Sequence, residues 1–497
     1  MLKTALRNTK KYVRFLVGKE NVRTGRFFTK STLAKQMASL FTLPVGRELH
    51  LLGPGAGPGI LSAALTESLC QRGFSGTVFL TAYENNAEML PYLEKTLKSI
   101  RKICRKQYGV TFSYTIRPDN FVLALGDSFP PSLFYTEPEK YDMVIVSAPR
   151  DRLVKGAPEI RCADGLCNGA KDIAPLFALM SVFSLGENGQ CVGVFPGSFG
   201  ASPDLEKVRQ YVAGQAYLTA LCPLSGRKRP GKDKKESDKD LLCAFRAGKK
   251  PERFSVLTLR EDKDELVPLL SLPYERVAPA NGKPYLVLRS EAEAEALKTV
   301  ESQPETLVSL GLAVKTGLVL ESKYTEFVFD KQAEDTVPLF RPAQIKSGYI
   351  RMPVSAYIRP VIPSLAKSNR NMLFIRRVPA KRSRRLVTAG VYLASQCPYA
   401  SRISTQNKLL TVDSRGDKEM DFALLHGLYA VLTSDLYDTY FRAVCKAPSL
   451  SVSLLQNLPL PSADVLRQIG KDLTWGRVMT PEVCTVLVNR VLAIKTH

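Results

Sequence analysis

The feature that constrains this chain most is a glycine-rich turn between a short apolar strand and an Ala/Leu-rich helix. The segment Leu51-Leu52-Gly53-Pro54-Gly55-Ala56-Gly57-Pro58-Gly59 continues the strand expected at residues 49–52 and precedes the helix expected at residues 60–71. Glycines let a backbone approach a ligand closely, and the start of a helix favours the polar or charged end of that ligand. A turn with structural duties alone is the competing interpretation of the motif taken by itself.

Strand and helix patterns alternate along the first half of the chain. This alternation predicts an α/β fold with a parallel, doubly wound sheet, whose ligands bind at the carboxyl ends of the strands. Polar residues stand at three successive strand ends, namely Glu84, Asp127 and residues 147–150, which favours a ligand site over a purely structural turn. The further strands are expected at residues 76–83, 120–125, 142–146 and 191–195, and the further helices at residues 31–41, 88–108 and 174–185.

Positive charge is concentrated in two segments. The 497 residues carry 70 Lys and Arg against 47 Asp and Glu, a formal net charge of +23. Residues 1–36 hold ten basic residues and one acid, whereas residues 341–412 hold 14 basic residues and no acid. A nucleic acid is the natural counterpart of such segments. Tyr, Asn, Gln and Ser are interleaved in the second segment, so both phosphate and base-edge contacts are expected, and generic RNA binding is the alternative.

Composition favours a soluble cytoplasmic protein. No apolar run reaches the ~18 residues of a membrane span. Ten cysteines in a chain of 497 residues form no disulfide-like framework, and no secretory signal pattern is recognisable. The basic N-terminus can also be read as an organelle transit peptide, but it runs without a cleavage region into residues 24–30, which we assign to the fold. The spacing of Cys162, Cys167 and Cys191 is poor for zinc, so no metal is expected, and three histidines leave little basis for a His-dependent nucleophile.

The pattern changes after residues 226–240, where Lys, Arg, Pro and Asp crowd into what reads as an exposed loop. Short β-like runs follow, and the spacing becomes helical at residues 421–445. We therefore expect two domains. The first is an α/β domain with a basic N-terminal arm at residues 1–245, and the second is a β-rich domain with a helical C-terminus at residues 246–497.

These motifs resemble the adenine-N6 DNA methyltransferases of bacterial type II restriction–modification systems, in the arrangement with the cofactor motifs first and the target-recognition domain last. Residues 25–30, Gly-Arg-Phe-Phe-Thr-Lys, are similar to that family's Gly-Gln-Phe-Phe-Thr-Pro, and residues 53–59 to its Asp-Pro-Gly-Ala-Gly-Thr-Gly. The resemblance implies a Rossmann-like methyltransferase domain followed by a DNA target-recognition domain. It also implies S-adenosylmethionine as the cofactor and double-stranded DNA as the partner.

The resemblance assigns roles to single residues. Glu84 would hold the ribose of the cofactor and Asp127 its adenine, while residues 147–150 stand at the catalytic Asn-Pro-Pro-Tyr of the family. The cofactor-binding residues implied in this way are Phe28, Thr29, Gly53, Pro54, Gly55, Gly57, Gly59, Glu84 and Asp127. The DNA-binding residues expected in the second domain are Lys346, Arg376, Arg377, Lys381, Arg382, Arg384, Arg385 and Asn407.

Departures from the family pattern fall where catalysis and cofactor binding are decided. Ser147-Ala148-Pro149-Arg150 replaces Asn-Pro-Pro-Tyr, whose Asn accepts a hydrogen bond from the target amino group and whose Tyr stacks on the flipped base. Gly53 replaces the leading acid of the cofactor loop, and Lys30 replaces a proline. We therefore expect a DNA-binding protein with weak or lost methylation, acting as a recognition or scaffold subunit beside an active methyltransferase or nuclease in restriction–modification or phage defence. The alternatives are an active enzyme that uses Ser147 and Arg150 in unusual roles, and an RNA-binding protein.

Overall fold

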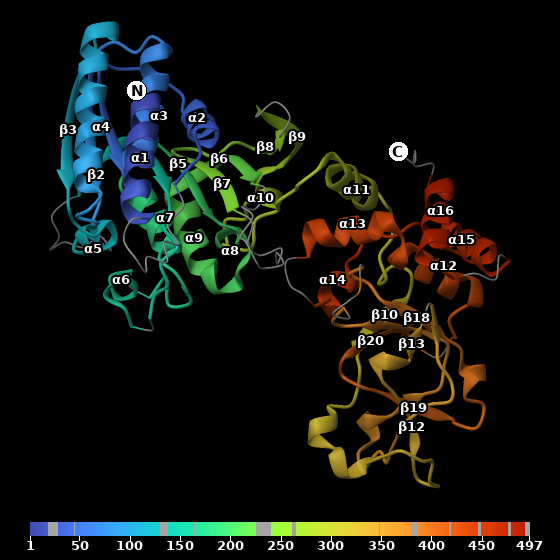
Figure 1. Ribbon diagram of the computed structural model, residues 1–497. Coiled ribbons are helices and arrows are strands. Elements are labelled where there is room, and N and C mark those ends of the chain that lie inside the picture. The colour runs from blue at the N-terminus through green and yellow to red at the C-terminus, as the bar shows by residue number, and fades with distance from the viewer. Residues whose placement is uncertain are drawn as a thin grey trace. The chain divides into compact units, whose positions relative to one another are not determined.

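The chain folds into two compact units, Met1–Ser290 and Glu291–His497 (Figure 1). We had placed the division after residue 245, whereas in the structure it follows Ser290. This computed structural model describes residues 1–17, 28–43, 45–129, 138–154, 156–163, 165–224, 240–260, 265–346, 348–379, 383, 385–416, 419–445, 449–475 and 479–492. The expected loop at residues 226–240 lies almost wholly outside the described residues.

The first unit is built on a seven-stranded sheet with the strand order β3-β2-β1-β4-β5-β7-β6. Strands β1 to β5 are parallel, and β7 runs antiparallel to both of its neighbours. The strands are β1 (Glu48–Gly53), β2 (Thr77–Tyr83), β3 (Thr111–Arg117), β4 (Tyr141–Ser147), β5 (Leu185–Pro196), β6 (Ala216–Pro223) and β7 (Asp240–Ala247). The chain order reverses between β1 and β4, which is where ligands bind in open α/β sheets. The predicted Rossmann-like α/β domain is confirmed.

Helices cover the sheet because their apolar faces and those of the strands bury each other. The helices of one layer share a single apolar core with the strands, and Figure 1 shows α1 running beside α4. Residues 2–17 of the N-terminal basic arm therefore form a packed helix, which Asn8 anchors by donating from its side-chain amide to Thr96 Oγ1 at 2.9 Å. The helices of this layer are α1 (Leu2–Val17), α2 (Ser31–Ser39), α3 (Ile60–Gln71) and α4 (Leu90–Ile103). Two further helices pack separately from them: α7 (Ala174–Phe183) against β5, and α9 (Glu206–Gln215) against β6.

One expected strand is wrong. Residues 120–125 fall in the short helix α5 (Phe121–Gly126), whose N-cap Asn120 accepts a hydrogen bond from the amide of Val122 at 3.0 Å. The third strand is instead β3, along which inward and exposed side chains alternate. Periodicity alone cannot distinguish a short buried strand from a short buried helix, and asparagine is a favoured N-cap. Asp127 consequently follows a helix and not a strand.

A hairpin and a short helix extend the first unit beyond β7. The hairpin is formed by β8 (Arg253–Arg260) and β9 (Glu265–Pro273), and α10 (Tyr274–Val277) follows it. The Tyr274 hydroxyl accepts a hydrogen bond from the amide of Leu218 on β6 at 2.7 Å. The segment we had assigned to the second domain therefore continues the packing of the first sheet.

The second unit combines two small sheets with a group of helices. Their orders are β10-β20-β17-β18-β14-β13 and β11-β15-β12-β19-β16. The strands are β10 (Leu312–Thr316), β11 (Val328–Phe329), β12 (Val337–Phe340), β13 (Ile345–Lys346), β14 (Gly348–Ile350), β15 (Tyr357–Ile358), β16 (Lys367–Ser368), β17 (Met372–Arg376), β18 (Ala389–Tyr392), β19 (Arg402–Thr405) and β20 (Leu409–Ser414). The helices are α11 (Glu291–Glu301), α12 (Phe422–Thr433), α13 (Asp435–Val444), α14 (Val452–Gln456), α15 (Ala463–Trp475) and α16 (Pro481–Val491). The expected β-rich region with a helical C-terminus is confirmed.

Close packing gives the second unit a rigid interior. The rings of Phe340, Phe374 and Tyr392 stack or meet edge-on with centroids 4.8 to 5.2 Å apart. Helices α12 and α15 approach backbone to backbone, because Gly427 and Gly470 leave no room for a Cβ against the opposite helix. Such an interior holds the surface residues of the sheets in fixed positions. All ten cysteines of the chain are free thiols, and within the described ranges no helix has the length and apolar character needed to cross a membrane.

Candidate cofactor and catalytic site

The glycine loop after β1 depends on conformations that only glycine adopts easily. Gly55, Gly57 and Gly59 have φ of +58°, +55° and +88°. A Cβ at Gly59 would lie 3.0 Å from Thr96 Cγ2, and a Cβ at Gly55 would lie 3.3 Å from the ring of Phe177. The glycines are therefore required both by the left-handed backbone and by close packing.

Glu84 closes the loop from the end of β2. Its side chain is buried, with Oε2 accepting a hydrogen bond from the amide of Gly57 and Oε1 one from the amide of Asn86, each at 2.8 Å. A carboxylate offers about four acceptor positions, so roughly two remain for the hydroxyls of a ligand. The sequence therefore identified a residue that links the glycine loop to the end of β2.

An aromatic group flanks the other side of the loop. Phe28 lies 3.8 Å from the position that a Cβ of Gly57 would occupy, and its ring meets Tyr12 of α1 edge-on at 5.9 Å. The Tyr12 hydroxyl accepts a hydrogen bond from the side-chain amide of Asn86 at 3.2 Å. Thr29 is buried beside Phe28 in the chain. Tyr12 was not expected in the site, because α1 had been read only as a basic arm.

Gly53 and Pro54 form the buried start of the loop. A Cβ at Gly53 would lie 3.3 Å from the hydroxyl oxygen of Ser62 on α3. An acidic side chain at this position would have to displace Ser62 or point away from it. The loss of the family's leading acid is thus accompanied by close approach of α3.

The residues directly after β3 are Pro118, Asp119 and Asn120, and the expectation that Asp127 follows this strand is wrong. Asp127 is exposed at the carboxyl end of α5. Phe121 instead reaches the site, since its ring centroid lies 5.4 Å from that of Tyr83 on β2 and 5.2 Å from that of Phe177 on α7. Phe121 and Phe177 were missed because an apolar residue within an expected strand or helix is usually read as core.

The tetrapeptide at residues 147–150 begins at the last residue of β4, as expected. The amide of Ala148 donates to the carbonyl of Val194 on β5 at 3.1 Å, a bond that a proline at this position could not form. The Arg150 guanidinium forms an ion pair with Asp240, the first residue of β7. Ser147 and Pro149 are half-buried. Arg150 is thus drawn toward β7 by a carboxylate that the sequence did not reveal as its partner.

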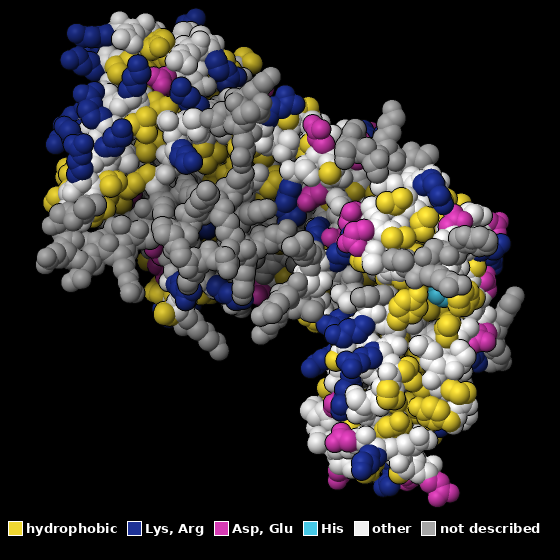
Figure 2. Space-filling view, turned by 45° about the vertical axis from the view of Figure 1, so that its right-hand side comes forward, with side chains coloured by type: hydrophobic (Ala, Val, Ile, Leu, Met, Phe, Trp, Pro, Cys, Tyr) yellow, Lys and Arg dark blue, Asp and Glu magenta, His cyan; other side chains and the backbone are white. Residues whose placement is uncertain are grey.

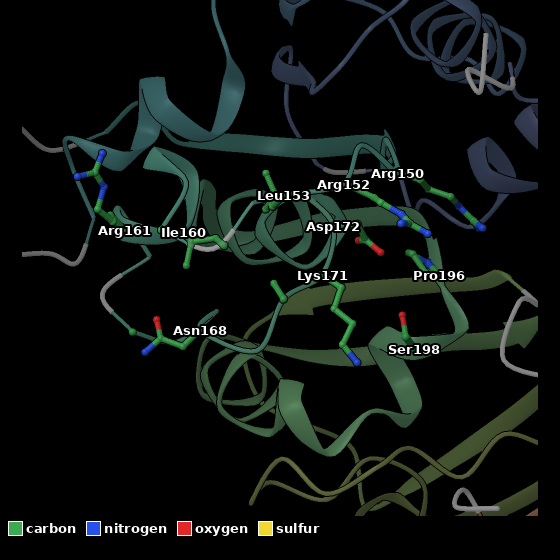
Figure 3. Close-up of a pocket in the computed structure, with 13 residues that line it drawn as sticks. Arg150, Arg152, Leu153, Ile160, Arg161, Asn168, Lys171, Asp172, Pro196 and Ser198 are labelled. Carbon is green, nitrogen blue, oxygen red and sulfur yellow. The ribbon is translucent and has the colours of Figure 1, made fainter. Parts of the chain in front are cut away.

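A cavity of about 1140 Å³ opens beside this edge (Figure 3). It lies at the carboxyl ends of β4 and β5, and its walls come from the loops after these strands. None of its described lining residues is aromatic. The lining consists of Arg150, Arg152, Leu153, Gly156, Ile160, Arg161, Gly165, Asn168, Ala170, Lys171, Asp172, Pro196 and Ser198.

The cavity is predominantly basic, with four cationic side chains and one carboxylate in its lining. Asp172 is partly buried, and burial raises the pKa of its carboxyl group while the charge of Arg150 opposes this shift. Asp172 Oδ1 also accepts a hydrogen bond from the amide of Ala174 at 3.1 Å. Apart from Arg150, none of these lining residues had been singled out from the sequence.

The residues expected to bind DNA divide into two kinds in the second unit. Lys346 and Arg377 have exposed side chains, and Asn407 is partly exposed. Arg376 is committed internally, since Nε and Nη2 donate to the carbonyl of Pro342 at 2.9 and 2.6 Å. Arg385 likewise donates to the carbonyl of Thr433 at 3.1 Å and pairs with Asp435 at 2.6 Å. The remaining three residues of the expected set, Lys381, Arg382 and Arg384, lie outside the described residues.

Exposed Lys and Arg side chains also gather on the first unit. Figure 2 shows them along the edge that holds α4. The basic residues of α4 and of the short helix that continues it are Lys95, Lys98, Arg101, Lys102, Arg105 and Lys106. In the part of the chain that the structure describes, no three His, Cys, Asp or Glu side chains come together as metal ligands.

Known proteins resemble the chain along most of its length. M.PstI of Providencia stuartii, a type II methyltransferase, is 23% identical over 465 residues, which cover 91% of this chain and 90% of that protein. M.BsuBI of Bacillus subtilis, also a type II methyltransferase, is 23% identical over 460 residues, covering 90% and 89%. The resemblance to type II methyltransferases is confirmed. No family model matches the chain.

Solved restriction–modification structures are also similar to the chain. The type IIG restriction endonuclease BpuSI is 14% identical with a TM-score of 0.48, covering 97% of this chain and 67% of that one. The type IIL enzyme MmeI, solved with DNA, is 10% identical with a TM-score of 0.47, covering 100% and 74%.

S-adenosylmethionine, the cofactor expected from the likeness to type II methyltransferases, is supported by the similarity to M.PstI and M.BsuBI and fits the residues present. Left-handed glycines provide close backbone approach, the buried Glu84 carboxylate has acceptor capacity left for ribose hydroxyls, and Phe28 provides an apolar wall. These residues all lie at the ends of β1 and β2 or on α1 and the segment after it. The cofactor half of the site therefore retains the features that the resemblance requires.

Proposed function

We propose that the chain is a DNA-binding protein with a methyltransferase fold that binds S-adenosylmethionine and in which adenine-N6 methyl transfer is weak or lost. The observation that carries this proposal is the edge at residues 147–150, where Arg150 pairs with Asp240 and the adjoining cavity has no aromatic residue in its described lining. A flipped base needs a stacking surface and an acceptor for its amino group. Bound cofactor would supply the methyl group, so the impaired step is the binding of the target adenine at residues 147–150.

Methyl transfer is the direct test. The purified chain, methyl-labelled S-adenosylmethionine and a mixture of random duplexes should give no label in adenine above that of a protein-free control. A type II methyltransferase treated in parallel serves as the positive control. Label in adenine at a rate comparable with that control would overturn the proposal.

The DNA-binding part of the proposal rests on the acid-free segment, residues 341–412, which lies in the second unit. We expect neutralisation of its exposed cations, Lys346→Ala with Arg377→Ala, to weaken duplex binding and to lower the salt slope by about two, one for each phosphate contact. The charge-matched control is Lys298→Ala with Lys323→Ala, both exposed and outside the segment. Equal salt slopes in the two double variants would show that Lys346 and Arg377 do not face DNA.

Arg385 should behave differently from these exposed cations. Because its guanidinium satisfies the carbonyl of Thr433 and pairs with Asp435, we expect Arg385→Ala to lower thermal stability before it affects DNA binding. Thermal unfolding of Arg385→Ala beside Arg377→Ala separates the two roles. Equal stability of both variants would contradict a structural role for Arg385.

A second candidate function is an active adenine-N6 methyltransferase that uses Ser147 and Arg150. The glycine loop and Glu84 serve it as they serve the first proposal, and the hydroxyl of Ser147 at the end of β4 is a possible acceptor for the target amino group. It requires methyl transfer that is abolished by Ser147→Ala. An RNA-binding role on the same fold is separated from both by competition between duplex DNA and structured RNA at equal salt.

Within a cell, we propose that the chain acts as a recognition or scaffold subunit beside an active methyltransferase or nuclease of a restriction–modification or phage-defence system. Retained DNA binding without methyl transfer is what such a role requires. Co-purification with a methyltransferase or nuclease encoded nearby, and recovery of sequence-specific methylation or cleavage only in the complex, are the expected results. A partner that is equally active and specific alone would contradict the role.

A further inference from the structure

We infer that the cavity at the carboxyl ends of β4 and β5 binds a phosphate group and not a target base. The inference rests on the proposed function and deepens it, because it names the ligand chemistry of the altered edge. No residue of this cavity other than Arg150 had been assigned a role.

Three stretches of chain converge on the cavity. Residues 150–153 follow β4, residues 156–163 and 165–172 precede α7 and include the short helix α6 (Pro158–Arg161), and residues 196–198 lead from β5 into the short helix α8 (Gly197–Ala201). Figure 3 shows Arg150 and Arg152 extending in the same direction, toward Pro196, while Lys171 extends toward the segment that carries Ser198. Cationic groups from different loops therefore face one space.

The charges around the cavity are only partly balanced. Asp240 pairs with Arg150 from outside the lining, and Asp204 approaches Lys171 at 3.8 Å. Among the described residues, Arg152 and Arg161 form no ion pair. Clustered like charges favour the entry of a counter-ion, and the guanidinium fork matches the oxygens of a phosphate.

An uncharged donor also lies near Arg152 and Lys171. Ser198 adds a hydroxyl, which is a common donor to phosphate oxygens, whereas Asn168 lies at the other end of the lining (Figure 3). The single acid of the lining, Asp172, is partly buried and already accepts a hydrogen bond from the amide of Ala174. No aromatic side chain is present in the described lining to stack on a neutral base. The donor set therefore selects for phosphate oxygens over the face of a base.

The test compares ligands with and without a phosphate. The full chain is titrated calorimetrically with deoxyadenosine 5′-monophosphate, with deoxyadenosine, and with a short duplex at several salt concentrations. The variant is Arg152→Ala with Lys171→Ala, and its charge-matched control is Lys249→Ala with Lys283→Ala, exposed residues of the same unit outside the lining. Arg152→Lys with Lys171→Arg retains the charge, and thermal unfolding checks that each variant folds.

We expect the phosphate-bearing ligands to lose at least about tenfold in affinity in the Arg152→Ala, Lys171→Ala variant, to keep it in the control, and to regain most of it in the charge-retaining variant. A loss for the monophosphate alone identifies a free nucleotide as the source of the phosphate. A loss for the duplex, with a salt slope smaller by about two, identifies the DNA backbone.

The inference is overturned if deoxyadenosine binds as tightly as its monophosphate, or if neither the monophosphate nor the duplex distinguishes the variant from the control. Its failure is distinct from failure of the proposed function. Methyl incorporation into adenine decides the latter and involves none of these titrations.

Discussion

The two halves of one sheet edge differ in how their residues are bonded. At the ends of β1 and β2, the left-handed glycines and the buried Glu84 carboxylate form a closed set of backbone contacts. At the ends of β4 and β5, the tetrapeptide at residues 147–150 differs from the family pattern, and Arg150 is tied to Asp240 beside a basic cavity without aromatic residues in its described lining. The residues of the cofactor half fit the expected cofactor, whereas residues 147–150 depart from the catalytic tetrapeptide of the family that the sequence resembles.

This difference follows from what each half contributes to folding. Glu84 binds two backbone amides, and Gly59 packs against α4, so changes there would disturb the first unit itself. Residues 147–150 end β4 with a backbone bond from Ala148 to Val194, and of these four residues only Ala148 is buried. Exposed side chains of the second half can therefore change with less effect on the fold than those of the first half.

The largest expected effect is on the cofactor half. Glu84→Ala removes the acceptor for two backbone amides and for the ribose, so we expect the affinity for S-adenosylmethionine to fall at least about tenfold. Isothermal titration calorimetry measures the change, with exposed Glu88→Ala as the control. Unchanged affinity in Glu84→Ala would show that the retained loop does not hold the cofactor.

An effect on stability is expected when the glycine loop of the same half is altered alone. Gly59 and Gly73 have nearly equal φ, +88° and +85°, but a Cβ at Gly59 meets Thr96 whereas one at Gly73 meets nothing within 4 Å. Both Gly→Ala variants should lose roughly 1–2 kcal/mol from the left-handed backbone. Gly59→Ala should lose about 1–3 kcal/mol more from overpacking. Urea unfolding of the two variants gives this difference, and equal losses would mean that the loop is not held against α4.

Removal of the ion pair on the catalytic half should have a modest effect. Because the Arg150 side chain is about one-third exposed, Arg150→Ala should lower the free energy of unfolding by at most about 1 kcal/mol. The affinity for S-adenosylmethionine should stay within about twofold, since Arg150 pairs with Asp240 of β7, and β4 and β5 separate β7 from the strand that carries the glycine loop. A large loss of cofactor affinity would show that the two halves are still coupled.

The smallest expected effect concerns Asp172. Burial raises the pKa of its carboxyl group, so its favourable contribution to stability is fully present at pH below its unfolded pKa and is lost as pH rises through the folded pKa. Asp172→Asn retains an acceptor for the amide of Ala174 and should therefore be slightly more stable than the wild type near about pH 7. The difference should shrink on acidification. Urea unfolding of both proteins from neutral to acidic pH measures this difference in stability. An Asp172→Asn variant that is less stable than the wild type near neutrality would contradict the prediction.

Much of the cofactor half could be predicted from the sequence because it is local. The strand, glycine loop and helix are contiguous, and α3 has the bounds that its pattern predicts. Asp127 was misplaced because the short apolar run after Asn120 fits a strand and a helix equally well. Tyr12 was missed because its role depends on the packing of α1 beside Asn86.

The catalytic half was less accessible to prediction because its partners are distant in the sequence. Arg150 meets Asp240 across the sheet, and the cavity joins residues of three separate loops. In the second unit, composition identified a basic segment, but only the structure separates the exposed Arg377 from Arg385, which is bound to α12 and α13. Charge patterns locate a surface, whereas hydrogen bonds decide which cations remain free to use it.

Equilibrium dialysis of the full chain with methyl-labelled S-adenosylmethionine and duplex DNA tests the difference between the two halves most directly. One sample reports both cofactor binding and methyl transfer. We predict that label is retained with the protein and that none enters adenine after prolonged incubation. Label transferred to adenine, or no label retained with the protein, would contradict the account.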